Sequence, residues 1–217
     1  MRTISVFLLA ASGALSVLAH GADPSPDAPV HPRAAATVKD AKSYAQALQE
    51  WQTPEDVSTW IAARFGYDTA RAVLLSETQR AASRQLSIYG PREFFDAPSG
   101  ICVDLARFAV ETLRSIDQRL NPRYLMIEFA PVTIAGNTFR MHWLASYRRD
   151  GQHYFLADSR RPGHIAGPYA DVRTFIDEYA RYRSREIVGF RELDSHERKQ
   201  RSLASRQLRD GSQVTSP

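Results

Sequence analysis

The sequence predicts an α+β domain, in which helices come first along the chain and antiparallel strands follow. Two observations carry this prediction. Residues 37–116 show helix-start signals and apolar side chains at helical spacing. Three strand candidates then follow closely at residues 123–133, 138–147 and 153–159. Because helices and strands are segregated along the chain rather than alternating, we expect helices packed on an antiparallel sheet.

The helical part is expected to contain four segments. A polar helix covers residues 37–50, and the next begins with Thr53 as its N-cap and ends at Gly66. A further helical region covers residues 68–87. After a turn-rich stretch, residues 101–116 form an amphipathic helix that packs one face on a core.

After the three strand candidates, residues 170–183 predict a helix and residues 185–190 a last short strand that closes the domain. The stretch between residue 159 and this helix, which contains glycine and proline, reads as a loop. The apolar face of the last helix is expected to consist of Phe175, Ile176, Tyr179 and Tyr182.

The two ends of the 217-residue chain differ from its middle. Residues 1–21 carry one basic residue and then a run of small apolar residues, which is typical of a cleaved secretory signal. The run is shorter than the roughly 20 strongly apolar residues of a membrane span. Residues 22–35 predict a disordered, proline-rich spacer, residues 36–195 the domain, and residues 196–217 a disordered polar tail. We expect an exported protein, periplasmic or secreted, without a stable membrane anchor.

The charge of the chain does not favour a nucleic-acid partner. The 28 basic and 24 acidic residues give a net charge of only +4. A nucleic-acid binder would gather its basic residues into a stripe interleaved with aromatic ones. The densest basic cluster here lies in the polar tail instead, so we expect no nucleic acid among the partners.

Cys102 is the only cysteine of the chain, and it lies where the helix of residues 101–116 begins. Structural cysteines of exported proteins normally come in pairs. A single one excludes an internal disulfide and a zinc site built on several thiolates. The thiol is therefore buried and inert, an intermolecular linker, or a nucleophile. The free N–H groups and partial positive charge of a helix start favour a thiolate, and hence the last of these.

A base for this thiol is predicted from a hairpin. If residues 149–151 form a three-residue loop, His142 faces Asp158 across two strands, about 5 Å apart. A carboxylate there fixes the tautomer of the imidazole and stabilises its protonated form. A two-residue loop at 150–151 would shift the register by one residue and send Asp158 to the other face. His153 faces away from Asp158 and is the weaker candidate.

The segments "GICVDLARFAVETL" and "HWLASYRRDGQHYFLADS" resemble the transglutaminase-like superfamily, in particular its exported bacterial cysteine peptidases with a papain-like fold. The resemblance covers about residues 54–190. It implies that Cys102 is the nucleophile, His142 the base and then the acid, and Asp158 the orienting group. It also implies acyl transfer from amide bonds of a protein or peptide substrate through a thioester, with hydrolysis favoured over cross-linking. No cofactor is expected.

The remaining groups of the site are less specific. Gln85, Tyr89 and Trp143 are candidates for the second oxyanion donor or for substrate contacts, and Arg160 could bind an acidic group of the substrate. Asp104 favours the helix start electrostatically. Because the apolar Ile101 and Val103 flank the thiol, no calcium site is expected there, and no other metal ligand is assigned.

Two readings from other classes stay open. The chain can be a non-catalytic binding module on the same fold, since one fold often carries unrelated functions. It can also be a structural protein whose single thiol forms an intermolecular disulfide.

Overall fold

The computed structural model describes residues 25–31, 38–39, 41–80 and 86–197. The signal expected at residues 1–21, Gln85 and nearly all of the expected tail lie outside these described residues. Most of the domain expected at residues 36–195 lies within them.

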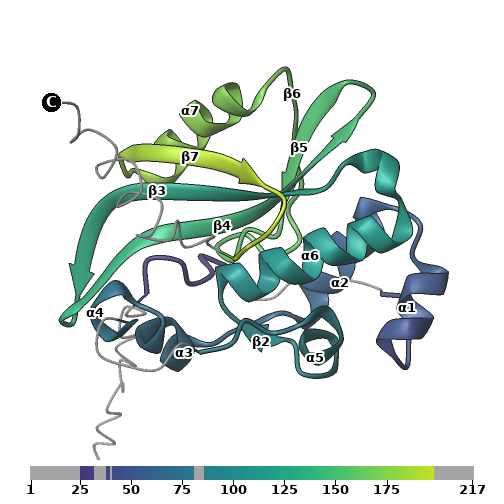
Figure 1. The fold of residues 1–217 in the computed structure, drawn as a ribbon, viewed down its shortest axis with the longest axis horizontal. Coiled ribbons are helices and arrows are strands. Elements are labelled where there is room, and N and C mark those ends of the chain that lie inside the picture. Colours follow the sequence, from purple (N-terminus) through teal and green to yellow (C-terminus); the bar gives the residue numbers. More distant parts are fainter. Residues whose placement is uncertain (1–24, 32–37, 40, 81–85, 198–217) are drawn as a thin grey trace, which may run out of the picture.

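A five-stranded sheet forms the centre of the molecule, with the strand order β6-β5-β4-β3-β7 (Figure 1). Every neighbouring pair in this sheet is antiparallel. This confirms the α+β class predicted from the order of elements. The strands are β3 Arg123–Ile134, β4 Asn137–Arg149, β5 Gln152–Leu156, β6 Ala166–Tyr169 and β7 Ile187–Leu193.

Helices cover both faces of this sheet. The long helix α6, Cys102–Ile116, lies on one face together with the N-terminal helices, and α7, Val172–Arg183, lies on the other (Figure 1). A short parallel pair, β1 Gly66–Tyr67 and β2 Ser99–Gly100, precedes α6, and a 3-10 turn, Gln118–Leu120, follows it. The N-terminal helices are α1 Tyr44–Glu50, α2 Pro54–Arg64, α3 Thr69–Leu74, α4 Glu77–Arg80 and α5 Pro91–Asp96.

Each face of the sheet has its own core. Under α6, Leu105, Phe108 and Leu113 are fully buried at helical spacing, as the sequence predicts. Under α7, Phe175 and Tyr179 pack on β5 and β3. The active-site candidates of β4 and α6 are thus held between two packed layers.

Five elements differ from their predicted form. The first helix begins only at Tyr44, and the described part of the expected helical region 68–87 contains the two short helices α3 and α4. The stretch before Cys102 contains α5, and the expected loop after residue 159 contains strand β6. In α7 the buried face continues to Arg183, which is 8% exposed, whereas Tyr182 is 38% exposed.

The register of the β4–β5 hairpin also differs from the prediction. Arg149 pairs with Gln152, so the loop has two residues, Asp150 and Gly151, both with positive φ. Such left-handed pairs match the twist of the strands better than a type I turn does. Tyr147 therefore faces Tyr154, and the predicted pairing of His142 with Asp158 across two regular strands is wrong.

The N-terminal segment 25–31 belongs to the folded domain rather than to a disordered spacer. In the view of Figure 1 it passes close to β4 (dark purple), and its contacts extend from Tyr67 on the α6 side to Arg183 of α7 on the other. Ser25, Asp27 and Ala28 are buried, and the backbone N–H of Val30 donates to the carbonyl oxygen of Arg160 at 3.1 Å. The structure differs from the prediction here because polar partners far along the chain pair with this segment.

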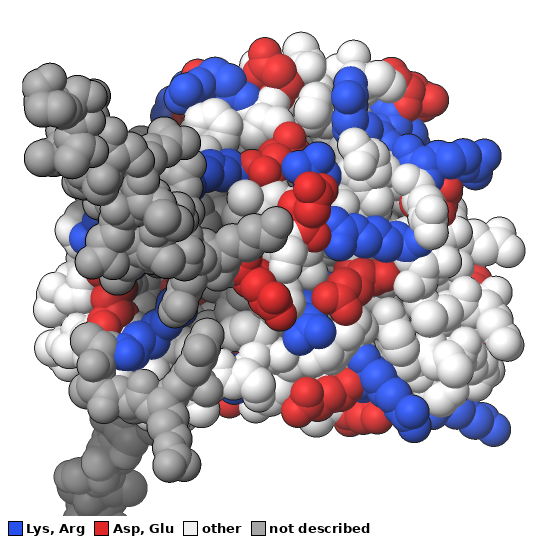
Figure 2. All heavy atoms as spheres, viewed as in Figure 1, with Lys and Arg blue, Asp and Glu red and all other residues white. Residues whose placement is uncertain are grey.

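The surface of the described part is mixed in charge. On the face shown in Figure 2, basic and acidic side chains are interspersed. None of the described helices is long and apolar enough to cross a membrane.

Candidate active site

Cys102 is the first residue of α6 and is 5% exposed. Its position is fixed by Asp104, whose carboxylate accepts from the backbone N–H of Ile101 at 3.1 Å and of Tyr89 at 3.0 Å. Arg71 donates to both oxygens of Asp104 at 2.8 Å, and Asp104 is fully buried. A buried bidentate pair of this kind fixes geometry strongly. Asp104 thus anchors the helix start that carries the thiol.

Gly100 leaves the space that this anchor needs. A Cβ at this position would lie 3.0 Å from Oδ2 of Asp104 and 3.1 Å from the ring of Phe94. Both neighbours are buried and hydrogen-bonded or packed, so neither can easily move. The glycine two residues before the thiol therefore serves close packing around the helix start.

His142 lies on β4 and is fully buried, and its Nε2 is 3.3 Å from Oδ1 of Asp158. The hairpin register alone would turn Asp158 away from His142. Ala157, however, follows the end of β5 with φ +63, in the left-handed region that residues other than glycine rarely adopt. This reversal of the chain after β5 brings Asp158 back to the imidazole.

The Asp158 carboxylate is held by the loop that follows it. Its Oδ1 accepts from the backbone N–H of Arg160 at 3.0 Å, and its Oδ2 lies 3.3 Å from Nε of Arg161. The loop is fixed in turn on α2, where Ser58 donates to the carbonyl oxygen of Gly163 at 2.8 Å. Gly163 has φ +81, and a Cβ there would lie 2.3 Å from that of Ala62. The orienting group of the site thus depends on the contact between this loop and α2.

The electrostatics of the site favour a protonated imidazole. Burial alone would lower the pKa of His142, but the neighbouring Tyr179, Asp27 and Asp158 together raise it well above its usual value. Burial alone would raise the pKa of Asp158, but its contacts with His142 and the nearby Arg183 lower it to about 2. Both shifts favour an ion pair between the imidazolium of His142 and the carboxylate of Asp158.

The thiol, the imidazole and a third side chain meet at one point. The Sγ of Cys102, a ring nitrogen of His142 and a carboxylate oxygen of Asp27 all lie within 4.8 Å of one another. Strand β5 pairs with β4 only along residues 145–149. Among the described residues, no strand covers that edge of β4 at His142, so the thiol at the start of α6 can approach the imidazole there.

Asp27 lies on the other side of the imidazole from Asp158. Its Oδ1 is 3.2 Å from Nδ1 of His142 and 2.5 Å from a guanidinium nitrogen of Arg183. The Nδ1 of His142 is buried and makes no hydrogen bond of good geometry to any described residue. Arg183 also donates to Tyr179 Oη at 2.9 Å, and the ring of Tyr179 stacks on the imidazole. The two ring nitrogens thus face two different carboxylates.

Three of the predicted residues converge, and the other candidates lie around them or elsewhere. Cys102, His142 and Asp158 are brought together. Arg160 lies beside the site, where its guanidinium donates to the carbonyl oxygen of Pro26 at 2.7 Å. Tyr89 contacts the residues that anchor the start of α6: its backbone N–H donates to Asp104, and the guanidinium of Arg71 lies 3.8 Å from the centre of its ring. Trp143 points into the α6 core and contacts Tyr124 edge-on, so its predicted role at the site has no support in these contacts.

The residues at the site could ligate a metal ion, since Asp27, Cys102 and His142 each offer one ligand atom. The guanidinium of Arg183, however, contacts Oδ1 of Asp27 at the same place. A second cation there would be repelled, so this cluster fits an ion-pair network better than a metal centre.

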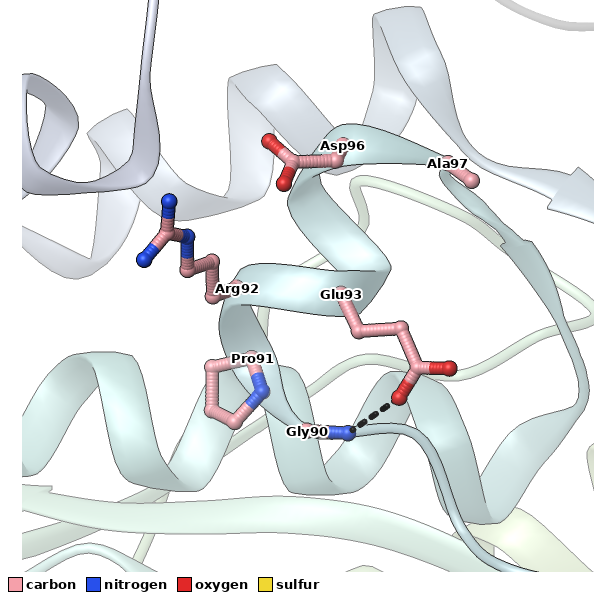
Figure 3. A pocket seen from close by; sticks show the side chains of 6 residues that line it. All are labelled: Gly90, Pro91, Arg92, Glu93, Asp96 and Ala97. Carbon is pink, nitrogen blue, oxygen red and sulfur yellow. Dashed lines mark hydrogen bonds between the residues drawn. The ribbon is translucent and has the colours of Figure 1, made fainter.

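A separate hollow lies over the start of α5 and involves none of these residues (Figure 3). The carboxylate of Glu93 points back there to the backbone nitrogen of Gly90, at 3.4 Å. The residues that line this hollow are Gly90, Pro91, Arg92, Glu93, Asp96 and Ala97.

Two site residues were not found from the sequence. Arg183 continues the buried stripe of α7 one turn after Tyr179, and this spacing was a usable signal. Asp27 lies in a proline-rich stretch that carries no periodic pattern, and nothing local to the sequence indicates its position.

Comparisons with known proteins show which family the chain belongs to. A family model described as a transglutaminase-like domain matches residues 37–187. No curated protein matches the chain. Among solved structures, calcium-bound LapG of Legionella pneumophila is similar at 16% identity over 69% of this chain and 71% of its own, with a TM-score of 0.36. That TM-score is too low to carry an argument, but the family model spans more than half of the chain. The protein is therefore a member of the transglutaminase-like domain family.

Proposed function

We propose that the protein is an exported, periplasmic or secreted, cysteine-dependent acyl-transfer enzyme that acts on amide bonds of proteins or peptides, with hydrolysis favoured over cross-linking. The observation that carries the proposal is that the buried imidazole of His142 has a nitrogen within 4.8 Å of Sγ of Cys102 and has its Nε2 3.3 Å from Oδ1 of Asp158. Membership of the transglutaminase-like family supports it.

The proposed reaction has two halves. The thiolate of Cys102 attacks the carbonyl carbon of the amide, and the imidazolium of His142 gives its proton to the leaving ammonia or amine as the C–N bond breaks. A thioester remains. Neutral His142 then takes a proton from water, whose oxygen attacks the thioester, and the thiol is regenerated. Asp158 stabilises the imidazolium and holds its orientation throughout.

The burial of Cys102 bears on the two rival readings. A thiol that is 5% exposed is poorly placed for a disulfide with a second molecule. A binding module, by contrast, would need neither the thiol nor the imidazole to be reactive, so the chemistry of Cys102 separates it from an enzyme.

The test measures both the reactivity of the thiol and turnover. Wild type and Asp27→Ala are compared, because the Asp27 carboxylate lies beside the sulfur. Each is incubated with casein and a fluorescent amine, and released ammonia, new N-termini and incorporated amine are quantified. We expect ammonia or new N-termini to exceed incorporated amine, and Cys102→Ala to abolish all three.

The alkylation of Cys102 by iodoacetamide is followed in the same proteins. Replacing His142 by alanine is expected to slow it by about tenfold or more, because the base that supports the thiolate is lost. The matched control is His153→Ala on the neighbouring strand, which should leave the rate unchanged. A thiol whose reactivity is indifferent to both histidines would contradict the enzyme and favour the binding module.

A further inference from the structure

We propose that residues 25–30 form an autoinhibitory strap: they fill an anion pocket between His142 and Arg183 with the Asp27 carboxylate, and keep the enzyme latent until they leave. The inference rests on the proposed function of the same site. It adds to that function the chemical class of group that the pocket binds, a carboxylate side chain presented by a turn.

The strap is held by specific contacts along its length. The carbonyl oxygen of Pro26 accepts from Arg160 at 2.7 Å and from Arg183 at 3.0 Å. The carbonyl oxygen of Asp27 accepts from the hydroxyl of Ser159 at 2.7 Å. The backbone N–H of Val30 donates to the carbonyl oxygen of Arg160 at 3.1 Å. The Ser25 hydroxyl contacts that of Tyr67. Backbone polar groups and one side chain of the strap thus all have hydrogen-bond partners in the domain, as expected for a segment that is docked in a specific position.

The pocket is built for one negative charge. Arg183, whose side chain is 1% exposed, and the protonated His142 supply two buried positive charges, and Asp158 supplies one negative charge. One positive charge is then left without a partner. A buried unpaired charge is costly, so the pocket requires an anion. Asp27 provides it, and its own pKa lies far below its usual value, because His142 and Arg183 outweigh the effect of burial.

The same charge balance shows why the occupied pocket is latent. The thiolate of Cys102 is the anion that must pair with the imidazolium during catalysis. The Asp27 carboxylate already lies 3.2 Å from Nδ1 of His142, and within 4.8 Å of the sulfur. The strap therefore competes with the thiolate for the imidazolium.

The first test compares Asp27→Ala with two matched controls. His31→Ala changes an exposed residue at the end of the strap, and Asp177→Ala removes an exposed carboxylate from α7. We expect Asp27→Ala to raise the rate of Cys102 alkylation by about tenfold or more. This is the rise expected if the strap covers the thiol in about nine-tenths of the wild-type molecules and in few molecules of the variant. Both controls should stay within about twofold of wild type.

Amide hydrogen exchange shows whether the strap has left. The N–H of Val30 should be protected in wild type and exchange freely in Asp27→Ala, while the amides of α6 stay protected and report an intact fold. If the strap remains docked in Asp27→Ala, Val30→Pro is added to remove its bond to Arg160. Free strap amides with an alkylation rate that is still within about twofold of wild type would overturn the proposal.

The pocket itself is tested with a peptide. A synthetic peptide of residues 22–31, added to Asp27→Ala, should slow alkylation again in a saturable way. The same peptide with alanine at the position of Asp27 should not. Equal inhibition by both peptides would overturn the carboxylate specificity.

The outcomes distinguish the strap from the function that it regulates. Release of a reactive, His142-dependent thiol without turnover of any amide would support the strap and contradict the acyl-transfer function. Equal turnover and equal alkylation in wild type and Asp27→Ala would support the function and contradict the strap.

Discussion

At the scale of single residues, the site depends on two positions whose roles are not chemical. Gly100 gives Asp104 room to anchor the start of α6, and Ala157 reverses the chain so that Asp158 meets His142. Both act on backbone geometry. A functional cluster can therefore be lost through residues that never contact a substrate.

Gly100→Ala is expected to destabilise the fold by about 1–3 kcal/mol, the usual effect of overpacking a filled interior. The added Cβ meets Asp104 and Phe94 at 3.0–3.1 Å. The measurement is urea unfolding followed by circular dichroism. The matched control is Gly189→Ala on β7, where a Cβ would meet only Glu128, at 3.8 Å and beyond. Equal stability of the two variants would show that Asp104 can move aside without cost.

At the scale of elements, the start of α6 is connected to α3 and to the chain before α5 through a single buried pair. Arg71 of α3 contacts both oxygens of Asp104, and it also donates to the carbonyl oxygen of Ser87. Two helices and a loop thus share one charge pair. Breaking such a pair on one side leaves the other charge buried alone.

Arg71→Met is expected to cost about 3–5 kcal/mol of unfolding free energy, since the Asp104 carboxylate loses its counter-charge in a fully buried position. Thermal and urea unfolding measure the loss. Arg119→Met serves as the control, because its ion pair with Asp117 is on the surface and should contribute little. A loss as small as that of the control would mean that Asp104 is stabilised by the backbone N–H groups of Ile101 and Tyr89 alone.

Comparison of the predicted and observed elements shows which parts of the fold local sequence signals can predict. The capped helix at Thr53, the cysteine helix and the three central strands follow from local signals, and they are found within a few residues of their predicted ends. The predicted register of the hairpin is wrong because "RRDGQ" fits a loop of two or three residues equally well. His142 and Asp158 nevertheless meet, because Ala157 adopts a left-handed conformation that no local signal predicts. The role of Asp27 at the site is not predicted either, because its partners Ser159 and Arg183 lie far along the chain.

At the scale of the whole molecule, stability should depend on pH through the buried cluster. The folded-state pKa of Asp158 is lowered from 3.8 to about 2, so its contribution is present above pH 3.8 and is lost as the pH falls toward 2. The pKa of His142 is raised well above 6.5, so its contribution is present below pH 6.5 and is lost as the pH rises through the folded-state value. These two groups together favour the fold most between about pH 4 and 6.5.

The melting temperature of wild type and of His142→Gln, recorded from pH 3 to pH 9, checks this expectation. Wild type should lose stability above pH 6.5, and the variant should lack that part of the decline, because glutamine does not titrate. The decline at acid pH should be smaller in the variant, because the contact with His142 is a main cause of the lowered pKa of Asp158. A parallel decline of the two proteins in the alkaline range would contradict the assignment of the charge to His142.

The position of Asp27 also has a consequence for the order in which the molecule is assembled. Its partners Ser159 and Arg183 are synthesised more than 130 residues later. As the chain emerges, the segment that closes the thiol is made before its partners and can dock only after α7 has formed. Closure therefore cannot precede the synthesis of α7, and every newly made molecule passes through an interval in which its sulfur is uncovered.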